Sequence, residues 1–241
     1  TGHVLSMWHA KCAGFLTAEA EPGARVHLGM TPHWRTVTWC AGAWLAGATP
    51  VLLDSGDSFV ENLLDEPPSI SVAFRIHWLF PSADVQVLVT MGSLATHWPT
   101  PLPPLTLDGI ADVMPFSDHF PPAPTDGSEP ALIVPQWDGL RTTSRDALVA
   151  PAQSDAVEKA LGTGARALLI REETVERAMR SVMAAWRAGL TAVLISPDAD
   201  AALDLLGSEH SPLRDGDAVL VKGSHDSGAW RLADFLVERS K

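Results

Sequence analysis

Apolar residues recur along the first third of the chain at spacings that alternate between helix and strand. Residues 5–19 carry an apolar side chain every three or four positions, which predicts an amphipathic helix. Two short apolar runs, 25–28 and 50–53, flank a second helical stretch, 34–46, that stops at Gly47. Strand, helix and strand in this order predict parallel strands joined by a right-handed crossover.

The same alternation returns in the second half of the chain, whereas the middle is less regular. Prolines are dense in 98–104 and 120–130, so we predict loops there. We therefore predict a mostly parallel, three-layer α/β fold, in one domain of residues 1–241 that can divide into two lobes, 1–115 and 130–241. The remaining predicted strands are 85–89, 131–134, 165–170, 191–195 and 218–221, and the remaining predicted helices are 105–114, 144–161, 174–188, 198–206 and 230–238.

Charge and composition limit the kinds of molecule that the chain is expected to bind. The net charge of -12 repels a nucleic-acid backbone and an anionic membrane, so we expect neither as a partner. The two cysteines, Cys12 and Cys40, are too few for a disulfide framework and predict buried thiols. No apolar run approaches the ~18 residues of a membrane helix, and the first residues lack a signal-peptide pattern, so we expect a cytoplasmic protein.

Several motifs of the first half resemble the N-terminal subdomain of AMP-binding, adenylate-forming enzymes such as acyl-CoA synthetases. They are Pro22-Gly23-Ala24-Arg25-Val26, His33-Trp34, Ala43-Trp44-Leu45-Ala46-Gly47-Ala48 and Val51-Leu52-Leu53-Asp54. Further landmarks resemble a family of short, stand-alone relatives of these enzymes: Leu102-Pro103, Asp112, Asp118, Phe120-Pro121 and Pro130-Ala131-Leu132. The resemblance implies the α/β fold of that superfamily.

The resemblance breaks at the position that implies ATP binding. In the full enzymes, a strand like 131–133 leads into a Ser/Thr/Gly-rich loop, ending Pro-Lys, that holds the ATP phosphates. Here, residues 134–144 contain one glycine, no Pro-Lys and the acidic Asp138. We also find no counterpart of the downstream segments that would bind adenine and ribose, so we expect no cofactor.

Two groups of residues remain as candidates for anion binding. Thr142, Thr143, Ser144 and Arg145 combine hydroxyls and a cation at a predicted helix start, although simple helix capping also explains them. Lys222 and Ser224 are a weaker pair in a segment, 213–224, that resembles the final strand and turn of Mur ligases. A strand and a glycine turn can arise in any α/β fold, so this likeness is local.

Other chemistry-bearing residues have simpler explanations, and we assign no catalytic residue and no metal ligand. His9 and Cys12 have a spacing on one helix that would allow both to bind a metal ion, but we find no two further ligands. Asp118-His119 are sequence neighbours in a loop, which does not make an acid/base pair. The helix 34–46 carries three tryptophans that cannot share one face, so either it is buried on most sides or it presents an aromatic patch to a partner.

Three functions from different classes remain open, and the third of them, a scaffold that docks onto a complete synthetase, would show an apolar patch at an oligomer interface. The first is a non-catalytic module that binds a small molecule or a protein on a retained adenylate-forming fold. The second is an ATP-dependent acyl-activating enzyme or ligase that uses ATP or AMP with Mg²⁺ in an unfamiliar site, between Arg141 and Arg145 or around Lys222. The sequence leaves the oligomeric state open.

Overall fold

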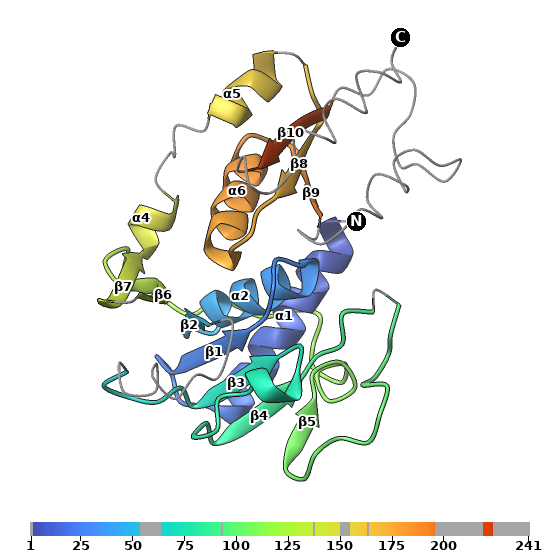
Figure 1. The fold of residues 1–241 in the computed structure, drawn as a ribbon, viewed down its shortest axis with the longest axis vertical. Coiled ribbons are helices and arrows are strands. Elements are labelled where there is room, and N and C mark those ends of the chain that lie inside the picture. Colours follow the sequence, from blue (N-terminus) through green and yellow to red (C-terminus); the bar gives the residue numbers. More distant parts are fainter. Residues whose placement is uncertain are drawn as a thin grey trace. The chain divides into compact units, whose positions relative to one another are not determined.

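The structure is a computed structural model that describes residues 2–53, 64–92, 94–136, 138–149, 155–162, 164–195 and 219–223. The chain divides into two compact units, Thr1–Leu148 and Val149–Lys241. Each unit contains its own sheet, and each is described by itself below (Figure 1).

The first unit is built on a seven-stranded, mostly parallel sheet, as predicted. Its strands lie in the order β5-β4-β3-β1-β2-β6-β7, and only the β6–β7 pair is antiparallel. Because β2 lies on one side of β1 and β3 on the other, the chain reverses its direction of travel across the sheet after β2. The strands are β1 (Arg25–Gly29), β2 (Thr49–Leu52), β3 (Ile70–Ala73), β4 (Val85–Leu88), β5 (Thr106–Asp108), β6 (Pro130–Gln136) and β7 (Gly139–Ser144).

Two helices, α1 (Gly2–Glu19) and α2 (Trp34–Leu45), pack together, and α2 also contacts β1 and β2 (Figure 1). Their contact is close, because a Cβ added at Gly42 would lie 2.5 Å from the Cβ of Cys12. Gly47 follows α2 with a φ of +74°, a left-handed conformation that glycine adopts without strain. The short elements η1 (Ile76–Trp78) and α4 (Arg145–Val149) complete the described helices near this sheet.

The tryptophans of α2 are mainly structural. Trp39 is fully buried and packs edge-to-face on Phe15, with ring centroids 5.8 Å apart. Trp44 donates from its indole N–H to the carbonyl of Ala131 at 2.7 Å, which ties α2 to β6. The cation of Arg35 lies over the ring of Trp34 at 4.5 Å and donates to the carbonyl of Gly92 at 2.9 Å. Of the two readings of this helix, burial on most sides is the one that holds.

A buried histidine lies in the central strand of the sheet. His27 on β1 has no exposed surface, and its Nδ1 lies 2.8 Å from the hydroxyl oxygen of Ser71. That oxygen also accepts the backbone N–H of Phe80 at 2.8 Å. Burial lowers the pKa of His27 to about 4, against the opposing effect of a hydrogen bond with the backbone of Leu53, so the ring is neutral at physiological pH.

The second unit has a smaller parallel sheet in the order β10-β8-β9. Thr174 caps α6, with its side chain accepting from the backbone N–H of Arg177, and Gly189 with a φ of +73° follows the helix. The elements are α5 (Asp155–Gly162), β8 (Ala167–Arg171), α6 (Val175–Arg187), β9 (Thr191–Leu194) and β10 (Val219–Gly223). The predicted helices 198–206 and 230–238 lie outside the described residues.

Two sequence-based expectations were wrong. The segment 105–114 contains strand β5 rather than a helix, because Thr106–Asp108 pair with β4 and the Asp108 carboxylate then accepts the N–H groups of Ile110 and Ala111 to form a turn. The helix predicted for 144–161 does not include Ser144, which ends β7; α4 and α5 lie within the segment, and residues 150–154 are outside the described ranges. Strands β3 and β7 were not anticipated.

The proposed lobes, 1–115 and 130–241, do not coincide with the two compact units. Residues 130–148 belong with the first unit, because β6 pairs with β2 and β7 pairs with β6. The proline-rich segment 120–129 therefore runs within the first unit, between β5 and β6. The single domain of residues 1–241 stays a prediction.

Candidate functional site

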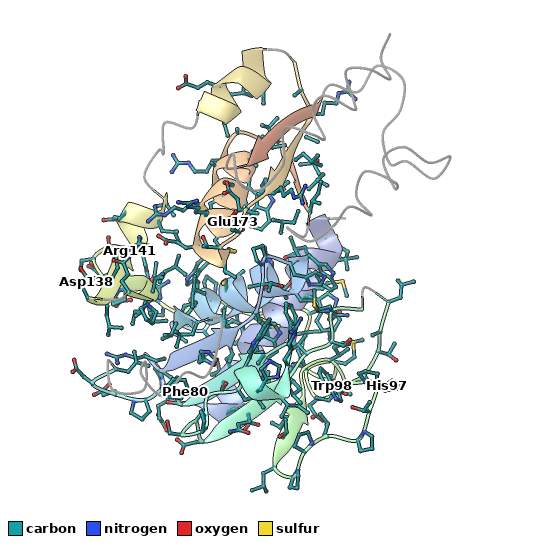
Figure 2. The ribbon with its side chains drawn as sticks, in the orientation of Figure 1. Phe80, His97, Trp98, Asp138, Arg141 and Glu173 are labelled. Atoms are coloured by element: carbon teal, nitrogen blue, oxygen red, sulfur yellow. The ribbon has the colours of Figure 1, made fainter. Side chains whose placement is uncertain are left out.

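The β6–β7 hairpin occupies the position at which the resemblance implies a phosphate-binding loop. Gln136 pairs with Gly139, so only two residues, Trp137 and Asp138, separate the paired positions. Asp138 is exposed, and both Asp138 and Arg141 lie on this hairpin (Figure 2). A loop that wraps phosphates needs several successive backbone N–H groups directed at the anion, and preferably no nearby carboxylate. The connection here has two residues between its paired positions, and one of them is acidic.

The four residues of the first candidate group do not converge on one point. Thr142 and Thr143 are neighbours on β7, and neighbouring strand residues project to opposite faces of a sheet. Accordingly, Thr142 is exposed whereas Thr143 is buried, opposite Leu132 of β6. Ser144 shares the face of Thr142, and Arg145 begins α4.

The group also has local roles that follow from its position. The hydroxyl oxygen of Ser144 accepts the N–H of Ala147 at 3.2 Å, as expected of a helix cap. Arg145 pairs with Glu129, at 3.5 Å from Nε to the carboxylate, and its backbone N–H donates to the carbonyl of Glu129 at 2.9 Å. These contacts support the capping interpretation for Ser144, and anion binding by the group stays a prediction.

The second candidate pair lies in the other unit. Lys222 is on β10, where it is in register with Ile170 of β8, and Ser224 lies outside the described residues. The two candidate groups thus belong to different units. The likeness of 213–224 to Mur ligases falls on a segment of which only 219–223 is described, and it stays a prediction.

An open groove of about 790 Å³ lies at the amino-terminal edge of the first sheet. It is lined by residues that lead into β1, β2, β3 and β6 and by the proline-rich segment before β6, which we call its wall. This wall is held in place because Ala123 donates to the carbonyl of Leu45 at 2.8 Å. Among the lining residues are Arg25, Glu66, Phe120, Pro121, Pro124, Glu129, Ile133 and Arg145.

The groove brings together residues that sequence reasoning treated separately or missed. Arg145 was a candidate, but Glu129, Arg25 and the proline-rich wall were not considered as a site. The missing signal was strand β7: once it returns antiparallel to β6, Ser144 pairs with Pro130 and Arg145 comes beside Glu129. The sequence pattern predicts a helix from residue 144 and no strand β7, so it did not place Arg145 beside Glu129.

Lys11 and Asp118 form structural contacts in the first unit. The ammonium group of Lys11 contacts the carbonyls of Met114 at 2.8 Å and Phe116 at 2.6 Å, and the carboxylate of Asp118 at 2.7 Å. Lys11 is therefore the structural partner of the Asp118 carboxylate, and the hydrogen bond from Lys11 lowers the pKa of Asp118.

Neither cysteine nor histidine chemistry stands out near α1. Burial raises the pKa of the Cys12 and Cys40 thiols well above the usual range, which makes them unreactive, and burial lowers the pKa of His9 to about 4. In the ranges that the structure describes, no three His, Cys, Asp or Glu side chains are grouped as a metal site requires. The helices in these ranges also lack the length and apolar character needed to cross a membrane.

Comparisons with solved structures place this architecture. An acyl-CoA synthetase from Brucella canis superposes with a TM-score of 0.69 at 15% identity, covering 97% of this chain and 43% of that one. The fold resembles that of acyl-CoA synthetases. A benzoate CoA ligase from Burkholderia xenovorans LB400 superposes with a TM-score of 0.62 at 17% identity, covering 86% of this chain and 42% of that one. MatB from Rhodopseudomonas palustris superposes with a TM-score of 0.59 at 16% identity, covering 84% of this chain and 41% of that one.

These likenesses establish the fold alone. The chain spans about two fifths of the length of each of these three proteins. No family model matches the sequence, and a search of curated proteins found no match either. The acyl-CoA-synthetase-like fold supports the resemblance read from the N-terminal motifs, and the chemistry of the chain has to be argued from its own residues.

Proposed function

We propose that this chain is a non-catalytic, small-ligand-binding module that keeps the sheet of adenylate-forming enzymes without their means of holding ATP phosphates. The observation that carries the proposal is the β6–β7 connection, in which two residues separate Gln136 from its partner Gly139. Phosphoryl charge has to be stabilised by convergent N–H groups, cations or Mg²⁺ during adenylation. The exposed carboxylate of Asp138 has the wrong sign for that role.

The distribution of cations supports the same proposal. Arg145 lines the groove at the amino-terminal edge of the sheet, whereas Arg141 does not line it. Thr142 and Thr143 face opposite sides of β7. A site that binds a triphosphate through this segment would need these groups to converge, and β7 separates them.

Nucleotide binding and turnover test the proposal directly. Calorimetry with Mg-ATP and with AMP, together with an assay for acyl-AMP and pyrophosphate over a panel of carboxylic acids, is performed on the full chain. We expect neither turnover nor thermal stabilisation at millimolar nucleotide, although a ligand at 100 times its Kd would add about 2.7 kcal/mol of stability.

An Arg141→Ala variant distinguishes the competing enzyme hypothesis. Formation of acyl-AMP by the wild-type chain would refute the non-catalytic proposal. If that activity disappeared in Arg141→Ala while the exposed Arg75→Ala control kept it, the hairpin would be the nucleotide site after all. An activity that both variants keep would refute the proposal equally, and would direct attention away from the hairpin.

A further inference from the structure

The groove lies at the edge of the sheet where ligands are least expected. In open α/β sheets, ligands usually bind at the carboxyl ends of the strands. Here the lining comes mainly from the residues that precede β1, β2, β3 and β6, which is the amino-terminal edge. Its volume of about 790 Å³ falls within the ~300–1,000 Å³ typical of small-molecule sites. A ligand in this groove would therefore occupy a place separate from the β6–β7 turn.

Arg145 lines the groove and has unused bonding capacity. Its side chain is only 15% exposed, and its Nε lies 3.5 Å from a carboxylate oxygen of Glu129. Its Nε is buried without a hydrogen-bond acceptor. A guanidinium group has five N–H donors, and leaving such donors unpaired in a shielded place is unfavourable. The arrangement favours an incoming acceptor.

The surroundings of Arg145 restrict what that acceptor can be. A planar guanidinium is suited to the paired oxygens of a carboxylate or a phosphate. Phe120, Pro121, Pro124 and Ile133 provide apolar lining in the same groove. Glu129 is the natural competitor of an anion for Arg145, but its side chain is 47% exposed and its contact is long, so the pair is weak.

We propose that this groove binds an amphipathic organic anion, with its carboxylate or phosphate head on Arg145 and its apolar body along the proline-rich wall. The inference rests on the proposed binding function and gives it a location and a ligand class. In the bound state, the anion replaces Glu129 as the partner of Arg145, and the carboxylate of Glu129 turns to solvent.

The test uses the full chain and three probes of equal length: octanoate, octyl phosphate and the uncharged octanamide. Calorimetry compares wild type with Arg145→Met, which keeps a long apolar side chain but removes the charge. Arg75→Met, a change at an exposed arginine outside the groove, is the matched control. Glu129→Gln is the second informative variant, because it removes the competing carboxylate while keeping the size of the side chain.

We expect at least one of the two anions to bind wild type at least about tenfold more tightly than octanamide, and to lose about tenfold or more in Arg145→Met. Glu129→Gln should bind that anion about two- to fivefold more tightly, since an exposed ion pair is worth up to about 1 kcal/mol. The tighter of the two anions identifies the preferred head group. A purely structural role for Arg145 would not produce the gain in Glu129→Gln.

The inference is overturned if neither anion binds at millimolar concentration, if octanamide binds as tightly as the anions, or if Glu129→Gln weakens binding. Equal binding by Arg145→Met and wild type would also overturn it. Each of these results leaves the proposed non-catalytic function standing, because that function is judged separately by acyl-AMP formation. Acyl-AMP formation combined with Arg145-dependent binding of the anions would reject the proposed function and keep the groove as a ligand site.

Discussion

Acidification is expected to destabilise the first unit through His27. This ring has no exposed surface in the central strand, and its Nδ1 is bonded to the hydroxyl of Ser71. Protonation would place a charge among Phe80 and the other buried side chains of the sheet. The perturbation is therefore a fall in pH, and His27→Gln removes the titrating group while keeping an amide that can still bond to Ser71.

The magnitude follows from the difference in pKa between the two states. Burial depresses the folded-state pKa of His27 from 6.5 to about 4, so the unfolded chain takes up the proton first. The contribution of His27 to stability is fully present above pH 6.5 and is lost progressively as the pH falls toward 4. Between pH 7.5 and pH 5 this loss amounts to about 2 kcal/mol for one such ring.

Urea unfolding followed by tryptophan fluorescence measures the effect. Trp8, Trp34, Trp39, Trp44, Trp78, Trp98 and Trp137 all precede the boundary at Leu148, so the signal reports mainly on the first unit. His9 and His33 have pKa values that are also lowered to about 4, so the wild-type chain should lose more than the share of His27 alone. The comparison of wild type with His27→Gln isolates that share.

We expect the stability difference between pH 7.5 and pH 5 to be about 2 kcal/mol smaller in His27→Gln than in wild type. His97→Gln, which changes an exposed ring, is the control and should behave as wild type. Equal pH dependence in wild type and His27→Gln would refute the reasoning, because it would mean that His27 does not gain a proton on unfolding in this range.

Two further predictions concern the packing of α1. Lys11→Met should lower the free energy of unfolding by about 1–3 kcal/mol, because two carbonyl oxygens lose their partner. Asp118→Asn should lower it by less, because this carboxylate is exposed to solvent. Urea titration compares the two variants, and equal losses would contradict the assignment. Gly42→Ala should destabilise by about 1–3 kcal/mol, since the new Cβ would lie 2.5 Å from that of Cys12; unchanged thermal unfolding would show that α1 and α2 separate readily.

The part of the fold that could be predicted from the sequence is the part governed by local spacing. The helices 34–46 and 174–188 were predicted because Gly47 and Gly189, which follow them, act on the neighbouring residues alone. Strand β5 was mistaken for a helix because pairing with β4, a partner about 20 residues away, decides its conformation.

The candidate site shows the same division. The absence of a Pro-Lys loop after β6 could be read from the residues themselves, and the short hairpin agrees with it. The groove could not be predicted, because it requires Glu129 and Arg145 to meet through the register of a strand, β7, that has an exposed threonine and arginine and little apolar periodicity. Arg145 was named as a candidate, but the residues that line the groove with it were not.

The β6–β7 hairpin also determines how the sheet ends. A parallel sheet that stopped at β6 would present a long row of free backbone groups to any passing strand. Instead, the edge is β7, with the exposed side chains of Arg141 and Thr142, and the opposite edge is β5, which is only three residues long. Both margins have features that discourage the addition of another strand, so self-association of this chain, where it occurs, is expected to use helices or loops rather than an extended sheet.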